Sequence, residues 1–381
     1  MRVVLLGAYA LQENRISGGP EAVIVQLAEG LRRLGAEVHV VTNSSRATAD
    51  SVQTVNGITL HRLRLRRMPR WTMIRANARA LAQTVRRIAP DIAHAHSAGT
   101  FADAALQSGA PAVITVHGVI QQEAQVFRDY GLTWREELSW RYEEWYERHC
   151  LTRAADIIAI SPYVADYYRH MTGAHMHLVE NPVGDAYFTL PPAPQSNDIL
   201  CAARIVHRKN ISGLLRAFAD LHSILPQARL RLAGEEHSEP DYAAECRQFV
   251  AQRGLDEAVS FLGWLDEAAM QAEYGRCGCL ALPSWQETAP VAIEQAMAAG
   301  RTVVASDVGG VRFLLADGQA GLLVQPSDEA GLTRALQRVL TDAALRQQLG
   351  AAAQQEAETR FRAAGVAQRT LAVYEEIIHR R

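Results

Sequence analysis

The chain has 381 residues, of which 48% are hydrophobic and 21% are charged, and its formal net charge is −2. This composition is typical of a folded globular protein, and the length suggests two domains of ordinary size or one large α/β unit. The near-neutral charge gives no electrostatic indication of a nucleic-acid partner.

The sequence contains neither a membrane-spanning run nor a disulfide pattern. No apolar run reaches the roughly 18–20 residues that span a bilayer, and the short apolar start of the chain continues into a strand, glycine loop and helix pattern unlike a signal peptide. The five cysteines (Cys150, Cys201, Cys246, Cys277 and Cys279) are odd in number and lack C-x-x-C spacing, which argues against a zinc site. We therefore expect a cytoplasmic protein.

Strand-like runs alternate with helix-length amphipathic segments along the chain. Almost continuously apolar runs are typical of parallel strands covered on both faces, and helices between them predict βαβ units. The expected strands of the first half are Val3–Leu6, Val38–Thr42, Ile58–Leu63, Ile92–Ala95, Ala112–Val116 and Asp156–Ile160. Those of the second half are Ile199–Ala202, Leu230–Ala233, Val259–Leu262, Leu280–Leu282, Thr302–Ala305 and Gly321–Val324.

A proline-rich stretch, "FTLPPAPQSND" (residues 188–198), separates the two series and is typical of a linker. We predict an α/β fold with two Rossmann-like, doubly wound parallel-sheet domains, residues 1–187 and 199–363. Such sheets bind ligands at the carboxyl ends of their strands, so we expect a cleft where the two edges face each other.

Gly18 and Gly19 precede an amphipathic helix in "RISGGPEAVIVQLAEGL". Paired glycines let a ligand approach the backbone closely, and a helix N-terminus favours an anion. The spacing is not G-x-G-x-x-G, so the dinucleotide fingerprint is absent and an NAD dehydrogenase is disfavoured. A plain turn explains the two glycines equally well.

Histidines follow two expected strands of the first domain. His117 comes after the run Ala112–Val116, where it can bond a sugar hydroxyl or a developing charge, and a purely structural histidine is an equal alternative. His94 and His96 share one face of an earlier strand. Because no third ligand lies nearby in the sequence, packing explains His94 better than metal binding.

The stretch "CAARIVHRKNISGLL" contains Lys209, the only lysine in a chain with 39 basic residues. A strand ends here and a helix begins near Asn210, with Arg204 five residues before the lysine. Two cations beside a helix N-terminus are typical of a diphosphate site. Lysine is a compact point charge and arginine a wide planar fork, so a tight pocket can require lysine. The alternative, a solvated basic loop, should have tolerated arginine here too.

Glu287 lies in the loop after the run Leu280–Leu282, Thr288 and Pro290 predict a helix start, and Gly300 predicts its end. A carboxylate in this loop faces the expected cleft and suits sugar hydroxyls as an acceptor. With Glu294 nearby it also suggests a glycosidase pair, but the parallel Rossmann-like halves and the basic site oppose that interpretation.

Together these motifs make the chain resemble the family-four glycosyltransferases, retaining enzymes of GT-B fold that use nucleotide-diphospho-sugars. The resemblance covers essentially the whole length. It rests on "SGGPEAVIVQLAEGLRRLGAEVHVVT", "PDIAHAHS", "TVHG", "IIAIS", "VENPV", "ARIVHRKN", "RLAGE", "FLGW" and "ETAPVAIEQAMAAGRTVVASDVGG".

The resemblance implies roles by position. Arg204 and Lys209 would hold the donor diphosphate, Glu287 would contact the donor sugar, and His117 would lie near the reacting carbon. The other donor-side residues would be Gly19, Gly263, Thr288, Ala289, Pro290, Val291, Glu294 and Gln295. The acceptor side would contain Gly18, Gly19, His96, His117 and Asn181. The last helix, residues 364–381, would cross back onto the first domain.

The chain departs from the family's usual motif of two glutamates with seven residues between them, because the second place holds Gln295. Glutamine can bond ribose hydroxyls without a charge, and Glu294 compensates only on a rotated helix, since helical neighbours point about 100° apart. Pro290 also comes earlier than in the usual glycine-rich version. These departures bear on the donor, UDP- or GDP-linked, more than on the reaction class.

Residues 61–87 carry nine arginines and no acidic residue. An apolar stripe runs along the expected helix, beside Arg75, Arg79 and Arg86; its members are Ile74, Ala78, Leu81, Val85 and Ile88. A core-packed helix with a solvated basic face is the first interpretation. The second is peripheral membrane contact of the Arg62–Arg87 segment, with anionic lipid or a lipid-diphosphate acceptor.

We therefore expect a retaining sugar transferase, monomeric or dimeric, that binds a nucleotide-sugar donor and a carbohydrate or lipid-linked acceptor. No D-x-D motif occurs in the sequence, so we expect no essential metal and no cofactor. The alternatives are another GT-B nucleotide-sugar enzyme, such as an epimerase or a phosphorylase, and a non-catalytic sugar-nucleotide binder.

Overall fold

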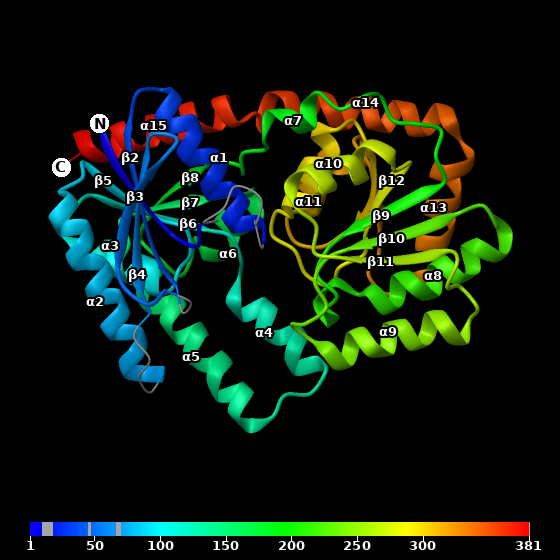
Figure 1. The fold of residues 1–381 in the computed structure, drawn as a ribbon, viewed down its shortest axis with the longest axis horizontal. Helices are drawn as coiled ribbons and strands as arrows, with labels where there is room; N and C mark the ends of the chain where they lie inside the picture. The colour runs from blue at the N-terminus through cyan, green and yellow to red at the C-terminus, as the bar shows by residue number, and fades with distance from the viewer. Residues whose placement is uncertain (10–17, 45–46, 66–69, 381) are drawn as a thin grey trace. The chain divides into compact units, whose positions relative to one another are not determined.

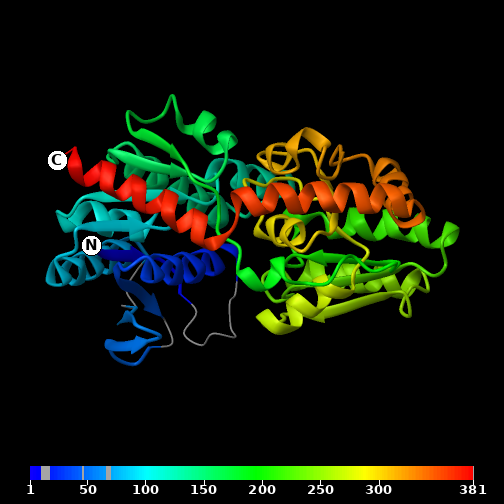
Figure 2. The same ribbon diagram turned by 90° about the horizontal axis from the view of Figure 1, so that it is seen from above.

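The computed structural model describes residues 1–9, 18–44, 47–65 and 70–380, which form two compact units (Figures 1 and 2). Unit 1 contains Met1–Gln121, Thr133–Pro182 and Ala363–Arg381, and unit 2 contains Gln122–Leu132 and Val183–Arg362. The proline-rich stretch 188–198 lies wholly within unit 2. So does the segment 122–132, an excursion that no sequence pattern predicts.

Unit 1 is built on a sheet with eight strands among the described residues, in the order β3-β4-β2-β1-β5-β6-β7-β8. All neighbours pair in parallel except β3 and β4, which are antiparallel. The strands are β1 (Arg2–Leu6), β2 (Glu37–Ser44), β3 (Ser51–Val55), β4 (Ile58–Arg64), β5 (Ile92–Ala95), β6 (Ala112–Val116), β7 (Asp156–Ala159) and β8 (His175–Leu178).

The helices of unit 1 cover both faces of this sheet. Figure 1 shows α1 and α15 on one face and α2, α3 and α5 on the other, as right-handed crossovers require. The helices are α1 (Gly19–Arg33), α2 (Arg70–Ile88), α3 (Thr100–Ser108), α5 (Trp134–Leu151), α6 (Pro162–Tyr168) and α15 (Ala363–His379), and α4 (Ile120–Asp129) begins in unit 1 and continues into unit 2.

The core of unit 1 is aliphatic and includes both ends of the described chain. Leu5 of β1, Ile24 and Leu31 of α1, and Val366 and Tyr374 of α15 belong to one buried cluster. Helix α15 packs on α1 at Gly30, where an added Cβ would lie 2.7 Å from the Cβ of Ala367. Only glycine permits this close approach.

The core-packed interpretation of the basic helix is confirmed for α2. Its apolar stripe, from Ile74 to Ile88, is at most 9% exposed, whereas Arg75, Arg79 and Arg86 are exposed. The Arg86 guanidinium donates to the carbonyls of Gln107 and Ser108 at the end of α3, which suits the negative end of that helix. Residues 66–69 of the basic segment lie outside the described residues.

Unit 2 is built on a sheet whose six described strands all pair in parallel, in the order β11-β10-β9-β12-β13-β14. The chain moves outward from β9 in one direction and from β12 in the other, so these neighbours mark a topological switch point. The strands are β9 (Asp198–Ala202), β10 (Arg229–Ala233), β11 (Val259–Gly263), β12 (Cys279–Leu282), β13 (Thr302–Ser306) and β14 (Leu322–Val324).

Helices again cover both faces of the unit 2 sheet, with α13 packed on α8 and α14 on α11. The helices are α7 (Asp185–Phe188), α8 (Ile211–Ile224), α9 (Pro240–Gln252), α10 (Glu267–Arg276), α11 (Val291–Ala298), α12 (Val311–Leu314), α13 (Glu329–Thr341) and α14 (Ala343–Arg360), with short 3-10 turns at His207–Lys209 and Ala316–Gly318. The expected α/β class with two doubly wound sheets is thus confirmed.

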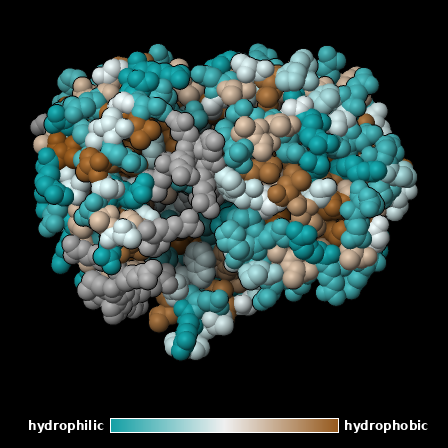
Figure 3. Space-filling view, in the orientation of Figure 1, coloured by the Kyte–Doolittle hydropathy of each residue, from teal (hydrophilic) through white to brown (hydrophobic). Residues whose placement is uncertain are grey.

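On the face drawn in Figure 3, hydrophobic residues form small groups within mostly hydrophilic or intermediate surroundings. Within the described residues, no helix is both long and apolar enough to cross a membrane. All five cysteines lie in the described part of the chain, are buried, and are free of disulfide bonds.

Candidate active site

Two loops meet at the switch point of the unit 2 sheet. Strand β9 leads through the turn His207–Lys209 into α8, and its neighbour β12 leads through residues 283–290 into α11. Parallel neighbours end at the same edge of a sheet, so the sequence-predicted Lys209 and Glu287 come together although 78 residues separate them.

Backbone and side-chain bonds lock the two loops to each other. The backbone N–H of Trp285 donates to the carbonyl of Arg208 at 2.9 Å. Arg208 Nη1 in turn donates to both the backbone and the side-chain oxygen of Gln286, each at 3.1 Å. The cations of the turn are therefore held in fixed positions relative to Glu287.

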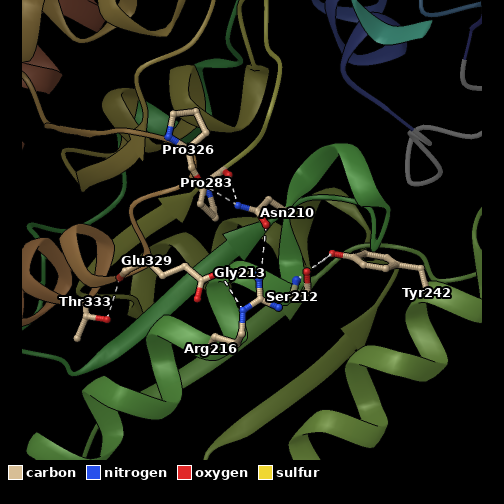
Figure 4. A network of polar contacts seen from close by, with 9 residues as sticks. All are labelled: Asn210, Ser212, Gly213, Arg216, Tyr242, Pro283, Pro326, Glu329 and Thr333. Atoms are coloured by element: carbon tan, nitrogen blue, oxygen red, sulfur yellow. Dashed lines mark hydrogen bonds and ion pairs between the residues drawn. The ribbon is translucent and has the colours of Figure 1, made fainter. Parts of the chain in front are cut away.

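Asn210, which follows Lys209, joins the loop after β12 to the start of α8, as Figure 4 shows for its bonds to Pro283 and Gly213. Its backbone is left-handed, with φ 51° and ψ 42°, and its side-chain oxygen caps the helix by accepting from Gly213 N at 3.2 Å. Its amide nitrogen donates to the carbonyls of Pro283, at 3.1 Å, and Pro326, at 3.3 Å. One side chain thus connects three segments. Arg216 of α8 adds a further link, because it pairs with Glu329 of α13 at 2.6 Å.

The site is strongly cationic. Lys209 Nζ pairs directly with the Glu287 carboxylate, and Arg208 Nη1 lies 3.7 Å from the other carboxylate oxygen. Burial opposes ionisation of Glu287, yet the charges of Lys209 and Arg208 lower its pKa overall. Burial lowers the pKa of Lys209, and repulsion from Arg208 and Arg204 adds to this effect against the attraction of Glu287. Lys209 and Arg208 beside Glu287, with Arg204 acting on Lys209, leave an excess of positive charge that suits an anion.

Most of the other residues expected on the donor side belong to unit 2, whereas Gly19 belongs to unit 1. Gly263 ends β11 with a φ of +67° and accepts from Gly234 N at 2.9 Å. Thr288, Ala289 and Pro290 are buried, and Val291 is the first residue of α11.

Of the two residues at the departure from the family motif, Glu294 is buried and Gln295 is partly exposed. Gln295 Oε1 lies 3.3 Å from the hydroxyl of Tyr274, a fully buried side chain. Glu294 itself is 0% exposed. The carboxylate beside Lys209 is therefore that of Glu287.

Unit 1 carries a histidine cluster at the carboxyl end of its sheet. His94 is buried, with Nδ1 2.5 Å from the Tyr374 hydroxyl and Nε2 2.6 Å from Thr115 Oγ1, so the packing interpretation of His94 is confirmed. His96 Nδ1 lies 3.1 Å from His117 Nε2. Burial lowers the pKa of His94 to about 3 and that of His117 to about 4, and it lowers the pKa of His96 well below the ordinary value. All three rings are neutral at physiological pH.

The other residues expected on the acceptor side, Gly18, Gly19 and Asn181, also belong to unit 1. The expectation that both glycines precede the first helix is corrected, because α1 begins at Gly19 and only Gly18 precedes it. Gly18 is exposed, and no described residue other than its chain neighbours has a heavy atom within 4 Å of where a Cβ would stand. Asn181 follows β8 and is 2% exposed.

Sequence reasoning missed Arg208 and Asn210. Arg208 stood in the basic run that we noted, but nothing in that run tells which of its cations points at Glu287. Asn210 was placed only as a helix start, and its left-handed backbone became visible in the structure. Within the described residues, no group of three or more His, Cys, Asp or Glu side chains is placed to hold a metal ion.

Comparison with known families agrees with this arrangement. Residues 17–186 match the family described as Glycosyltransferase Family 4, and residues 188–356 match the family described as Glycosyl transferases group 1. Together the two matches cover most of both units.

Two curated relatives illustrate the range of similarity. The D-inositol 3-phosphate glycosyltransferase of Stackebrandtia nassauensis is 34% identical over 185 residues, which is 47% of this chain and 42% of the relative. The chain thus aligns with less than half of that relative's length. The alpha-D-kanosaminyltransferase of Streptomyces kanamyceticus is 22% identical over 71% of each chain.

Solved structures share the fold along the whole chain. Sucrose-phosphate synthase from Thermosynechococcus elongatus has a TM-score of 0.84 at 22% identity and covers 100% of both chains. Anabaena HepE, in complex with UDP-glucose, has a TM-score of 0.76 at 19% identity and covers 99% of this chain and 100% of its own.

Proposed function

Because the chain belongs to the family 4 glycosyltransferases of GT-B fold, we propose that it moves a sugar from a nucleotide-diphospho-sugar to a hydroxyl of a carbohydrate or lipid-linked acceptor, with retention at the anomeric carbon. The observation that carries this proposal is the cationic site at the unit 2 switch point, where Arg208 and Lys209 flank Glu287.

The cations would act on the leaving group. As the bond from the anomeric carbon to the phosphate oxygen breaks, negative charge develops on the diphosphate. Lys209, Arg208 and Arg204 would stabilise that charge from positions fixed before the reaction, which is where electrostatic catalysis gains most. The ionised Glu287 would accept bonds from hydroxyls of the donor sugar, while keeping Lys209 in place.

The histidine cluster would act on the transferred sugar and the acceptor side. A neutral His117 can form a hydrogen bond with a sugar hydroxyl without adding charge near the reacting carbon. Gly18, His96 and Asn181 would complete the acceptor side, and Gly263 and Gln295 the nucleotide side. Similarity to HepE, whose structure contains UDP-glucose, makes a UDP-linked donor the first to test, with a GDP-linked donor next.

Binding and transfer can be tested in two steps. First, thermal shifts with UDP, GDP, ADP, dTDP and their sugars identify the donor, because a ligand of the folded state raises its stability. Second, Lys209→Arg should lower kcat/KM for transfer by about a hundredfold, the size of effect seen when one preorganised donor is lost, since the wider fork does not fit beside Glu287. Arg334→Lys, a basic-for-basic change at a 70% exposed side chain on α13, is the control. Parent-like turnover of Lys209→Arg, or the absence of any nucleotide-dependent shift, contradicts the proposal.

We also propose that transfer needs no metal ion, on the ground that Lys209, Arg208 and Arg204 supply positive charge at the leaving group. Full activity in EDTA is the expected result, and a loss that Mg²⁺ or Mn²⁺ restores contradicts it. Product analysis without an acceptor separates transfer from epimerisation, because an epimerase converts the nucleotide sugar without any acceptor.

Peripheral membrane contact through the Arg62–Arg87 segment is a separate proposal. The exposed Arg75 and Arg79 on α2 support it, because each arginine near an anionic surface contributes about 1 kcal/mol. The affinity for phosphatidylserine vesicles, measured by co-sedimentation, should fall about thirtyfold in Arg75→Gln/Arg79→Gln, as the loss of two such contributions implies. Equal sedimentation with neutral vesicles contradicts the proposal.

A further inference from the structure

The hydrogen bond between His96 and His117 can form in two ways. A neutral imidazole carries one hydrogen, on Nδ1 or on Nε2. Either His96 Nδ1 donates to His117 Nε2, or His117 Nε2 donates to His96 Nδ1, across the 3.1 Å that separates them. In the first form His117 carries its hydrogen on Nδ1, and in the second on Nε2.

The far nitrogen of His96 decides between these forms. His96 is 4% exposed, and its Nε2 has no hydrogen-bond partner among the residues that the structure describes. In the second form Nε2 would carry the hydrogen, so a donor would be buried without an acceptor. A buried N–H group without an acceptor has lost its hydration with no hydrogen bond in return, and such groups are rarer in proteins than buried acceptors without a donor. The first form leaves only a bare nitrogen at that position.

The surroundings of His96 hold its ring in place. The His94 ring packs against it in a tilted arrangement, with 4.1 Å between ring centroids. His94 cannot serve the orphan nitrogen, because Tyr374 and Thr115 already occupy its own two nitrogens. The backbone of Gly7 also passes so close that an added Cβ would lie 3.3 Å from the Cβ of His96.

We propose that His96 is a positioning residue that donates from Nδ1 to His117 Nε2 and thereby keeps the hydrogen of His117 on Nδ1. With its hydrogen on Nδ1, His117 has a donor on that nitrogen, and the chemical partner of such an N–H is an oxygen lone pair. Under the proposed function that oxygen belongs to the transferred sugar or to the acceptor. The position of the hydrogen is itself a property of the protein without substrate.

A second histidine pair in unit 1 provides a matched contrast. His39 Nδ1 lies 3.0 Å from His61 Nε2, the same atoms at nearly the same separation. In this pair the second nitrogen of His39 has a partner, because His39 Nε2 lies 3.0 Å from Glu37 Oε1. An ionised carboxylate only accepts, so His39 carries its hydrogen on Nε2 and accepts on Nδ1. His61 must then carry its hydrogen on Nε2, opposite to the arrangement inferred for His117.

Long-range ¹H–¹⁵N correlation spectra of the imidazole rings report which nitrogen is protonated. They should be recorded on the full-length, ¹⁵N-labelled protein at about pH 8, above the ordinary histidine pKa of about 6.5. The expected result is a hydrogen on Nδ1 of His117 and on Nε2 of His61. A hydrogen on Nε2 of His117 overturns the proposal.

Two substitutions of His96 test whether it is the cause. His96→Asn keeps an amide N–H near the position of Nδ1 and should leave His117 protonated on Nδ1. His96→Leu removes the donor, and His117 should shift toward Nε2. The unchanged His61 signals show that unit 1 is still folded. If His117 has the same pattern in both variants, His96 does not set it.

Transfer kinetics provide an independent readout. His96→Leu should lower kcat/KM about fivefold, the worth of one hydrogen bond, and His96→Asn should restore most of it. Nucleotide binding to unit 2, followed by thermal shift, should not change. If the wild-type protein transfers no sugar, the proposed function fails, whereas the spectra still decide the role of His96.

Discussion

Glu287 is the residue on which the charge balance of the candidate site depends. Its carboxylate is 6% exposed and pairs with Lys209, beside Arg208. A buried cation that loses its partner destabilises a protein by about 3–5 kcal/mol. We therefore predict that Glu287→Gln lowers the free energy of unfolding by about 3 kcal/mol at pH 7, measured by urea unfolding.

The pH dependence of this loss follows from the direction of the pKa shift. The folded pKa of Glu287 lies below its ordinary value, so its contribution is complete above the unfolded pKa of about 4.3 and disappears as the pH falls through the folded pKa. The difference between wild type and Glu287→Gln should shrink below about pH 4. Glu358→Gln, in an exposed pair with Arg362, is the control and should cost at most about 1 kcal/mol. A difference that is constant with pH contradicts the assignment.

At this scale the sequence predicted which residues meet better than it predicted how their side chains are oriented. Lys209 and Glu287 were predicted from local patterns, and the parallel pairing of β9 with β12 explains why they meet. The direction of Gln295 toward Tyr274 could not be predicted, because it depends on where α10 ends against α11. The absence of a described hydrogen-bond partner for His96 Nε2 could not be predicted either, because it depends on which distant segments bury the ring.

At the scale of elements, the start of α8 depends on Asn210, which combines a left-handed backbone with three side-chain bonds. Asn210→Ala should lower the free energy of unfolding by about 2–3 kcal/mol, because it loses the cap and strains the backbone. Asn210→Gly removes the bonds without the strain and should cost less. Asn210→Asp keeps the cap but loses the donor to Pro283 and Pro326. Urea unfolding ranks the three, and equal stability of Ala and Gly variants would show that the left-handed backbone carries no strain.

The strands that the sequence missed lie at the edges of the unit 1 sheet. All the expected strands are confirmed. They could be predicted because buried parallel strands are nearly continuously apolar. Strand β3 is exposed along its whole length and β8 at its two ends, so neither shows an apolar run. The turn between β3 and β4, Asn56-Gly57, has positive φ at both residues and is a strong hairpin signal that we overlooked.

At the scale of the whole molecule, the last helix, α15, completes the core of unit 1, which also contains the start of the chain. Val366 and Tyr374 of α15 lie in one cluster with Ile24 and Leu31 of α1. The family resemblance implied that the last helix returns to the first domain, whereas composition and periodicity alone do not say which core it covers. That information resides in pairwise fit, of which Gly30 is the clearest case, since its missing side chain makes room for Ala367.

Gly30→Ala tests this fit because two effects oppose each other. In a helix interior this change usually stabilises by about 0.5–1 kcal/mol. Here the new Cβ would stand 2.7 Å from the Cβ of Ala367 and 3.2 Å from the carbonyl oxygen of Ala363, and overpacking costs about 1–3 kcal/mol. We predict a net loss of about 1 kcal/mol in urea unfolding. Gly365→Ala, on α15 with only the flexible end of Arg369 within 4 Å, should stabilise instead. If both variants stabilise, α15 does not pack on α1 as closely as the structure indicates.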